Sequence, residues 1–246
     1  MKRTIDIVVS LCALLLLAAP LALMALAIWI EDRKSPLFLG RRVGPQGEFR
    51  MVKLRTMWPG AWKVGVNSTA SSDPRITKLG RVLRRLKLDE IPQLWNVLMG
   101  QMSLVGPRPQ VPAETLLYTA EERETLRIRP GITDLASIVF ADEGEILAGS
   151  PDPDLLYNQL IRPWKSRLAL AYIEHASLAV DVKIIALTLV GLVSRRRALR
   201  AVAGILEAWN SDSLLVRVAL REEVLVRWPP PGANQVFSYS ARTQTQ

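Results

Sequence analysis

Residues 7–30 form an almost unbroken apolar stretch, IVVSLCALLLLAAPLALMALAIWI. Thirteen of them are Leu, Ile or Val, and such side chains favour transfer into a bilayer. As a helix the stretch would be about 36 Å long, whereas the hydrocarbon core of a bilayer is about 30 Å thick. The sequence therefore predicts that this segment enters a membrane.

The sequence indicates that this segment lies in a membrane but does not decide its topology there. Pro20 lies at its centre and predicts a kink, because proline removes a backbone hydrogen bond. Both flanks are basic, with Lys2 and Arg3 before the segment and residues 33, 34, 41 and 42 after it. The positive-inside rule then draws both ends to the cytoplasm. A re-entrant helix and a single span are equally compatible with the residues, and a cleaved signal peptide is less favoured because the apolar region is too long.

The remaining composition indicates the kind of partner. The chain has 246 residues, 32 Lys and Arg against 23 Asp and Glu, a formal charge of +9, and 49% hydrophobic residues. This much apolar material excludes global disorder. A chain that is both apolar and basic suits an anionic membrane surface or phosphorylated ligands.

The rare residues exclude several chemistries. Cys12 is the only cysteine and His175 the only histidine, so no disulfide, zinc site or Ser-His-Asp triad can be assembled. No phosphate-binding P-loop, dinucleotide-binding glycine motif or nucleophile elbow occurs either. Any catalysis must rest on carboxylates, Lys, Arg, Tyr or hydroxyls, with or without a hard metal ion.

The elements predicted beyond the apolar segment are mostly short. Two strands should flank a turn at residues 44–47, followed by a loop over residues 58–73. Start and stop signals and apolar periodicity predict helices over residues 77–88, 92–99, 114–127, 164–193 and 198–226, with a strand or irregular segment over 132–140. The 164–193 segment could pack in the core or lie on a membrane surface.

One cluster could carry chemistry. Six basic residues precede two adjacent carboxylates, Asp89 and Glu90: they are Arg75, Lys78, Arg81, Arg84, Arg85 and Lys87. Arg side chains match phosphate oxygens, an ionised Asp can act as a nucleophile, and Mg²⁺ takes one or two carboxylates plus substrate phosphates. The spacing alone favours a simpler role, in which Asp89 or Glu90 caps the next helix and pairs with an Arg.

Two further turns each present an arginine. Arg108 lies in a Gly-Pro-Arg-Pro turn over residues 106–109, and Arg129 begins an Arg-Pro-Gly-Ile-Thr stretch followed by Asp134. Proline restricts the backbone on both sides of such an arginine. Each turn could hold its arginine toward a ligand or simply connect two elements with the arginine in solvent.

Three motifs follow one another closely in the sequence: DPRITKLGR at residues 73–81, LDEIPQLWNVL at 88–98 and MSLVGPRP at 102–109. Together they resemble the bacterial sugar transferase family, the small monotopic phosphoglycosyl transferases that begin the assembly of lipid-linked glycans. KLRTM at residues 53–57 and RPGIT at 129–133 also match, in the right order. The resemblance covers roughly residues 2–195.

The resemblance implies an α-rich α/β fold with a proline-kinked re-entrant N-terminal helix, short strands and surface-lying amphipathic helices. The expected organisation is a membrane helix over residues 1–33, a catalytic domain over 34–195, an amphipathic extension over 196–228 and a disordered tail over 229–246. The catalytic domain would lie on the cytoplasmic face of the bacterial inner membrane.

The reaction implied is transfer of a sugar 1-phosphate from a UDP-sugar to polyprenyl (undecaprenyl) phosphate with release of UMP. Asp89 would carry the covalent phosphosugar, and Asp89 and Glu90 would hold Mg²⁺ as the cofactor. The residues that would bind substrate are Lys53, Arg55, Arg75, Arg81, Gln93, Arg108, Arg129 and Asp134. Membrane lipid would be a further partner, and self-association as a homodimer is a further hypothesis.

Two alternatives make different predictions. A glycosyltransferase that passes on only the sugar would release UDP, and a membrane-anchored basic module would bind anionic lipid or nucleic acid without catalysis. No aromatic stacking pattern accompanies the basic residues, which argues against nucleic acid as a partner. Asp134-Leu135-Ala136-Ser137 departs from the Gly and Ala-Gln pattern of many family members, so the sequence does not identify the sugar.

Overall fold

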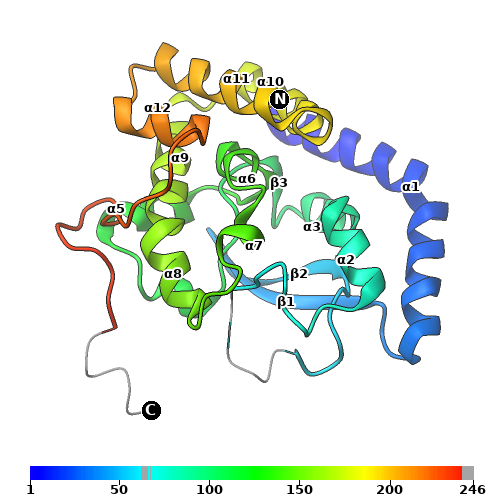
Figure 1. Ribbon diagram of the computed structural model, residues 1–246. Coiled ribbons are helices and arrows are strands. Elements are labelled where there is room, and N and C mark those ends of the chain that lie inside the picture. Colours follow the sequence, from blue (N-terminus) through cyan, green and yellow to red (C-terminus); the bar gives the residue numbers. More distant parts are fainter. Residues whose placement is uncertain (62–65, 67, 240–246) are drawn as a thin grey trace. The chain divides into compact units, whose positions relative to one another are not determined.

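The computed structural model describes residues 1–61, 66 and 68–239 (Figure 1). It is rich in helices, has a few short strands and begins with one long apolar helix, as the sequence predicts. The chain divides into two compact units that are not continuous in sequence. Unit 1 comprises Met1–Val64, Pro74–Leu117 and Leu126–Thr133, and unit 2 comprises Gly65–Asp73, Tyr118–Thr125 and Asp134–Gln246.

Helix α1 (Lys2–Asp32) opens unit 1 and contains Pro20. By length and composition it could cross a membrane, and most of its apolar side chains are exposed. Its two ends are nevertheless held by the rest of unit 1. Near the start, Asp6 accepts hydrogen bonds from the Ser103 hydroxyl at 2.9 Å and from the Leu104 amide at 3.1 Å. Near the end, Ile28 is buried in a cluster with Leu54 and Leu83.

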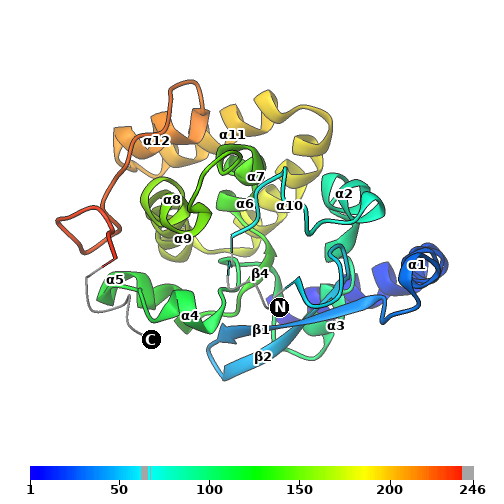
Figure 2. The same cartoon turned by 60° about the horizontal axis from the view of Figure 1, so that its bottom comes forward.

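The predicted pair of strands is present as an antiparallel hairpin (Figure 2). Strand β1 (Leu37–Gly44) pairs with β2 (Gly47–Leu54) along their whole length, and Phe38 lies opposite Lys53. Gly47 has a φ of 100°, a conformation that favours glycine in the tight turn. Below the hairpin, Met51, Val97 and Met102 form a buried apolar cluster.

Three short helical elements follow the hairpin, where the sequence predicts two helices over residues 77–88 and 92–99. Helix α2 (Lys78–Arg85) is capped by the Thr77 hydroxyl, which accepts from the Gly80 amide at 2.9 Å. The 3₁₀ turn η2 (Leu88–Glu90) precedes α3 (Gln93–Leu98). Gly80 is required sterically, because a Cβ there would lie 2.1 Å from the Thr56 carbonyl oxygen.

A second sheet brings two of the sequence motifs together. Strands β3 (Ser103–Val105) and β4 (Gly131–Thr133) are parallel, and helix α4 (Pro112–Thr115) follows β3. The backbones of Gly106 and Gly131 approach so closely that a Cβ on Gly131 would lie 2.1 Å from the Gly106 nitrogen. These two glycines therefore join the Gly-Pro-Arg-Pro turn to the Arg-Pro-Gly-Ile-Thr stretch.

Unit 2 is helical apart from its connections. Its helices are α5 (Ala120–Arg123), α6 (Leu135–Val139), α7 (Glu143–Ile146), α8 (Pro153–Leu160), α9 (Arg162–His175), α10 (Leu178–Val193), α11 (Arg195–Ala208) and α12 (Ser213–Leu220). Its core includes Trp164 and Leu168 of α9 and Val202 and Leu206 of α11, all nearly inaccessible to solvent.

Three predicted helices are subdivided. The single helix expected over residues 114–127 is wrong: α4, α5 and a 3₁₀ turn, η3 (Glu124–Arg127), replace it, because Thr119 starts a new helix with a capping box to Glu122. The 164–193 segment breaks before Ser177, whose hydroxyl caps α10. The 198–226 segment contains α11 and α12, and Asp212 caps the second.

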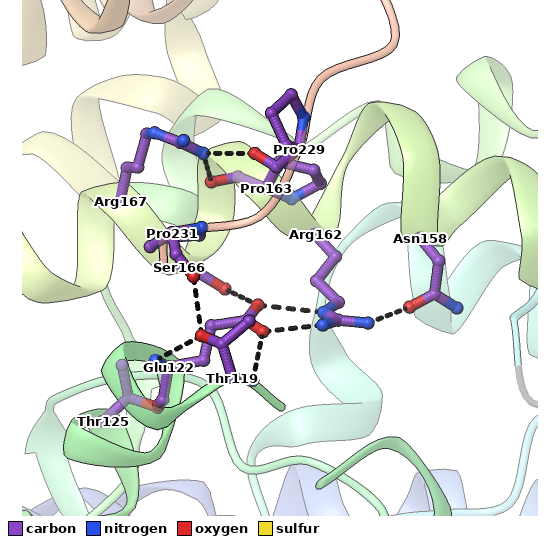
Figure 3. Close-up of polar contacts among 10 residues, drawn as sticks. All are labelled: Thr119, Glu122, Thr125, Asn158, Arg162, Pro163, Ser166, Arg167, Pro229 and Pro231. Atoms are coloured by element: carbon purple, nitrogen blue, oxygen red, sulfur yellow. Dashed lines mark hydrogen bonds and ion pairs between the residues drawn. The ribbon is translucent and has the colours of Figure 1, made fainter. Parts of the chain in front are cut away.

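A buried ion pair lies at the centre of unit 2 (Figure 3). Arg162 donates to both Glu122 carboxylate oxygens, at 2.9 and 2.6 Å, and also to Asn158 at 2.8 Å. Ser166 donates to the same carboxylate at 2.7 Å. Glu122 and Arg162 are 0% and 3% exposed. The pair therefore connects α5 to α8 and α9.

The segment after α12 is held against these helices. Pro231 accepts a hydrogen bond from the Thr119 hydroxyl at 2.6 Å, and Pro229 accepts one from Arg167 at 3.0 Å (Figure 3). Trp228 stacks on Trp164 with ring centroids 5.6 Å apart. The disordered tail predicted over residues 229–246 thus includes residues that make specific contacts, and residues 240–246 lie outside the described residues.

Candidate active site

Unit 1 brings three predicted site residues together from three elements. Lys53 comes from β2, Glu90 from η2 and Arg108 from the turn after β3. Lys53 Nζ donates to Glu90 Oε1 at 2.9 Å. Arg108 donates to the same oxygen at 2.6 Å and to Oε2 at 3.3 Å. The carboxylate is thus held by two cations that are far from it in sequence.

The electrostatics of this cluster favour an ionised Glu90. Burial alone would raise the pKa of Glu90, but Arg108 and Lys53 outweigh burial and hold this pKa well below its usual value. Burial lowers the pKa of Lys53, and the nearby Glu90 carboxylate partly offsets that effect. The two residues are therefore an interdependent buried pair.

Asp89 lies beside this cluster with a different environment. It is only 6% exposed, and Lys53 is close enough for the Asp89 charge to favour the protonated lysine. Over residues 1–61, 66 and 68–239, no hydrogen bond or ion pair to the Asp89 carboxylate is present. A nearly buried carboxylate with a neighbouring cation and no bonded partner is available to react with a ligand.

The local backbone places the two adjacent carboxylates in a turn. Lys87 has a φ of 58°, in the left-handed region, and this turn ends the α2 segment before η2 begins. Pro92 then precedes the first residue of α3. Asp89 and Glu90 therefore lie in a short turn between two helices. They are not the caps of α3, which takes no side-chain cap.

Three predicted substrate-binding residues lie elsewhere in unit 1. Arg55 donates to Asp32 at 2.7 Å and to the Ser35 carbonyl at 2.7 Å, which ties the end of α1 to the hairpin. Arg75 donates to the Ala61 carbonyl at 3.2 Å. Arg81 is exposed on α2. The structure does not bring these side chains to Glu90, and their role in binding stays a prediction.

The other three predicted residues have varied surroundings. Gln93 is 1% exposed, and its Nε2 is buried without a partner in the described structure. Arg129 is exposed beside the β3–β4 junction. Asp134 belongs to unit 2, where it caps α6 by accepting from the Ser137 amide at 2.6 Å. Substrate contacts for all three stay predictions.

Arg42 also belongs to this region, although its sequence context indicates only a basic flank of the apolar segment. It lies on β1, and its charge interacts with those of both Arg108 and Glu90. Strand alternation could have found it, because residues directly opposite one another in a hairpin share a face. That inference requires the register, which the sequence alone does not fix.

The donor set meets the modest requirements of Mg²⁺. Among the described residues there is no group of three or more potential protein ligands. Mg²⁺ commonly uses one or two carboxylates with substrate phosphates and water. Within the part of the chain that the structure describes, Asp89 has no bonded partner, and Glu90 Oε2 accepts only the longer of the two Arg108 bonds. A carboxylate oxygen has two lone pairs, so both side chains retain capacity for a metal ion.

Comparison with known proteins agrees with these motifs. Residues 1–195 match the family described as bacterial sugar transferase. This chain belongs to the bacterial sugar transferase family. The Asp89–Glu90 turn, the Arg108 turn and the hairpin all lie within the matched residues, so the cluster is part of the sugar transferase domain.

Three relatives of this sugar transferase illustrate the similarity. An undecaprenyl-phosphate glucose phosphotransferase of Komagataeibacter xylinus is 38% identical over 80% of this chain, and the match covers 36% of that longer protein. A UDP-glucose:undecaprenyl-phosphate glucose-1-phosphate transferase of Caulobacter vibrioides is 35% identical over 80% of this chain and 71% of its own. Exopolysaccharide production protein PSS of Rhizobium leguminosarum bv. phaseoli is 37% identical, and the match covers 79% of this chain and 96% of that protein.

Proposed function

We propose that this sugar transferase moves a sugar 1-phosphate from a UDP-sugar to undecaprenyl phosphate and releases UMP. The observation that carries the proposal is the pair of adjacent carboxylates in different environments. Glu90 is held by Lys53 and Arg108, whereas Asp89 has no bonded partner among the described residues. Relatives whose names specify undecaprenyl-phosphate sugar phosphotransfer support the choice of substrates.

The proposed first step is nucleophilic attack by Asp89. A carboxylate oxygen forms a bond to the β-phosphorus of the UDP-sugar, and the bond from that phosphorus to the bridging oxygen breaks. UMP leaves with the bonding electron pair, and the sugar phosphate stays on Asp89 as an acyl phosphate. Covalent catalysis of this kind divides one displacement into two, and it uses neither histidine nor cysteine.

The second step regenerates the enzyme. An anionic oxygen of undecaprenyl phosphate attacks the phosphorus of the acyl phosphate, and the bond to Asp89 breaks. The products are undecaprenyl diphosphosugar and the free carboxylate. Lys53 and Arg108 supply positive charge beside both displacements, and preorganised charge lowers the barrier where negative charge develops. Asp89 and Glu90 would hold Mg²⁺, which neutralises phosphate charge when it is bound.

The contacts of α1 support a re-entrant topology. A straight helix of its length would extend about 46 Å, yet both ends contact the same compact unit. Asp6 bonds to Ser103 at one end, and Asp32 bonds to Arg55 at the other. The α1 ribbon also changes direction along its length in Figure 1. We infer that both ends lie on the cytoplasmic face of the inner membrane, with the bend inside the bilayer.

Helix α10 supports a second membrane contact, made by unit 2. Leu189 is 61% exposed and Val193 is 90% exposed at its C-terminal end. The exposed Arg196 and Arg197 follow directly, at the start of α11. Apolar residues next to cations suit the boundary between acyl chains and anionic head groups. We infer that this end of α10 lies on the membrane surface.

The product distinguishes the proposed reaction from its rivals. Purified protein with undecaprenyl phosphate, Mg²⁺ and a panel of UDP-sugars should release UMP from at least one sugar. Asp89→Asn should retain no more than a few per cent of that activity. Release of UDP instead would indicate transfer of the sugar alone. Absence of turnover, with tight salt-dependent lipid binding that survives Asp89→Asn, would indicate a non-catalytic module.

A further inference from the structure

We propose that Arg42 is an additional phosphate-binding residue of this active site, on the opposite strand of the hairpin from Lys53. The proposal rests on the function proposed above and extends its binding machinery to β1. It arises from three features of the described residues: the hairpin register, the space left by Gly40, and the excess of cations around Glu90.

The register places Arg42 on the face of the hairpin that contacts Glu90. Phe38 lies opposite Lys53, Gly40 opposite Met51, and Arg42 opposite Phe49. Side chains directly opposite in an antiparallel pair share a face. Lys53 reaches Glu90 at 2.9 Å from this face, so Arg42 projects to the same side of the sheet as Lys53.

Gly40 leaves room on this face for the Arg42 guanidinium. A Cβ at Gly40 would lie 2.8 Å from Cε1 of Phe38 and 3.1 Å from Arg42 Nη1, so the Phe38 ring and the guanidinium both reach the space where a side chain would otherwise stand. The same Nη1 donates to the Arg41 carbonyl at 2.7 Å. The guanidinium is therefore folded back along β1, toward Gly40 and away from the turn of the hairpin.

Cations exceed paired carboxylates around Arg42, which favours binding of an anionic ligand there. Glu90 is already paired with Lys53 and Arg108. In the described part of the chain no carboxylate forms an ion pair with Arg42. Burial and the charge of Arg108 lower the pKa of Arg42 to about 10. A half-buried cation next to another cation is unfavourable in isolation, and a phosphate group between them would remove the repulsion.

Arg41 provides a matched control on the same strand. It lies opposite Arg50, on the other face of the hairpin. Its side chain is 72% exposed and donates to Glu48 at 2.8 Å. Substitution of Arg41 removes the same charge from the same strand without touching the face of Lys53.

Kinetics of Arg42→Gln and Arg41→Gln in the full chain test the proposal. Arg42→Gln should raise the KM for a phosphate-bearing substrate by about tenfold or more, the loss expected for a charged hydrogen bond. Arg41→Gln should stay within about twofold of the parent protein. A higher KM for the UDP-sugar assigns Arg42 to the donor diphosphate, and a higher KM for undecaprenyl phosphate assigns it to the acceptor. Arg42→Lys keeps the charge but not the planar fork, so it should give an intermediate increase.

A change in kcat alone, with a lowered melting temperature and both KM values unchanged, would overturn the proposal in favour of a structural role. Binding of inorganic pyrophosphate, measured by calorimetry, separates this proposal from the reaction itself. If the parent protein turns over no UDP-sugar but binds pyrophosphate, and only Arg42→Gln weakens that binding, the proposed function fails and the phosphate site stands. If neither KM nor pyrophosphate affinity differs between the two glutamine variants, Arg42 is not a phosphate ligand.

Discussion

Arg108 donates two hydrogen bonds to Glu90, with nitrogen–oxygen distances of 2.6 and 3.3 Å. Glu90 also accepts from Lys53, so one buried carboxylate fixes two cations that project from separate elements. Removal of that negative charge would break both ion pairs. The position of Arg108 therefore depends on Glu90 remaining ionised.

Substitution Glu90→Gln should destabilise the protein by about 2–3 kcal/mol. This value is at the low end for breaking a buried charge pair, because Arg108 is partly exposed. Denaturant unfolding in detergent measures the change. Glu48→Gln is the control: it breaks the exposed Arg41–Glu48 pair, and it should cost less than about 1 kcal/mol. Equal effects of the two substitutions would contradict the importance assigned to Glu90.

Activity should fall at alkaline pH below the usual lysine range. The pKa of Lys53 is lowered from 10.5, mainly by burial, so this side chain loses its proton at a lower pH than a surface lysine. At a pH above the pKa of Lys53 the lysine is neutral, and Glu90 loses one of its two cationic partners. In Lys53→Arg the alkaline decline of kcat/KM should move to higher pH, because arginine stays protonated. A decline at the same pH in both proteins would assign it to another group.

At acidic pH the titration of Glu90 affects stability with the opposite sign, because the pair is lost as the pH falls. The pKa of Glu90 is held well below 4.5, so its ion pairs contribute fully above the ordinary carboxyl pKa. That contribution is lost only as the pH falls through the lower, folded-state pKa. The difference in stability between the parent protein and Glu90→Gln should therefore persist at pH 4.5.

Glu122→Gln should destabilise unit 2 by about 3–5 kcal/mol, the usual result when one partner of a buried ion pair is removed. Glu122 and Arg162 are nearly inaccessible, and Ser166 also donates to the carboxylate. Glu121→Gln is a suitable control, because Glu121 is the exposed neighbour. Thermal unfolding should show a large decrease for Glu122→Gln alone. A similar melting temperature for both variants would show that the pair contributes little.

Cysteine labelling tests the re-entrant topology. In a Cys12→Ser background, single cysteines at Thr4 and Lys34 should react with a membrane-impermeant maleimide from the same side of the membrane. Cys12 is the native cysteine and is exposed on α1. Labelling from opposite sides would establish a spanning helix. If the end of α10 lies on the membrane, a cysteine at Val193 should be unreactive in the bilayer and should react once the protein is removed from the membrane.

Local features of the fold could be predicted from the sequence. The Gly-Pro-Gln-Gly turn implies the hairpin, and Thr77 and Pro92 mark where α2 and α3 begin. The helix breaks at Thr119 and Ser177 could not be predicted in the same way. A side-chain cap at these positions replaces a continued helix only when the flanking residues are packed.

The residues of the candidate site that lie in one sequence motif could be predicted. The contacts between residues that are distant in sequence could not. The adjacent Asp89 and Glu90 stand out in the sequence. That Lys53 and Arg108 bind the same carboxylate, whereas Arg55 binds Asp32, depends on the tertiary fold. The six basic residues predicted to bind substrate cannot be distinguished until the register of the hairpin and the close approach of Gly106 and Gly131 are known; they are Lys53, Arg55, Arg75, Arg81, Arg108 and Arg129.

We propose that Asp89 carries the phosphosugar, and UMP formed without acceptor tests this claim most directly. Protein mixed with the correct UDP-sugar and no undecaprenyl phosphate should release a burst of about one equivalent of UMP per active chain. The intact protein should gain the mass of a sugar phosphate, located at Asp89 and absent from Asp89→Asn. UMP that appears only when undecaprenyl phosphate is present, with no adduct on the protein, would contradict the claim.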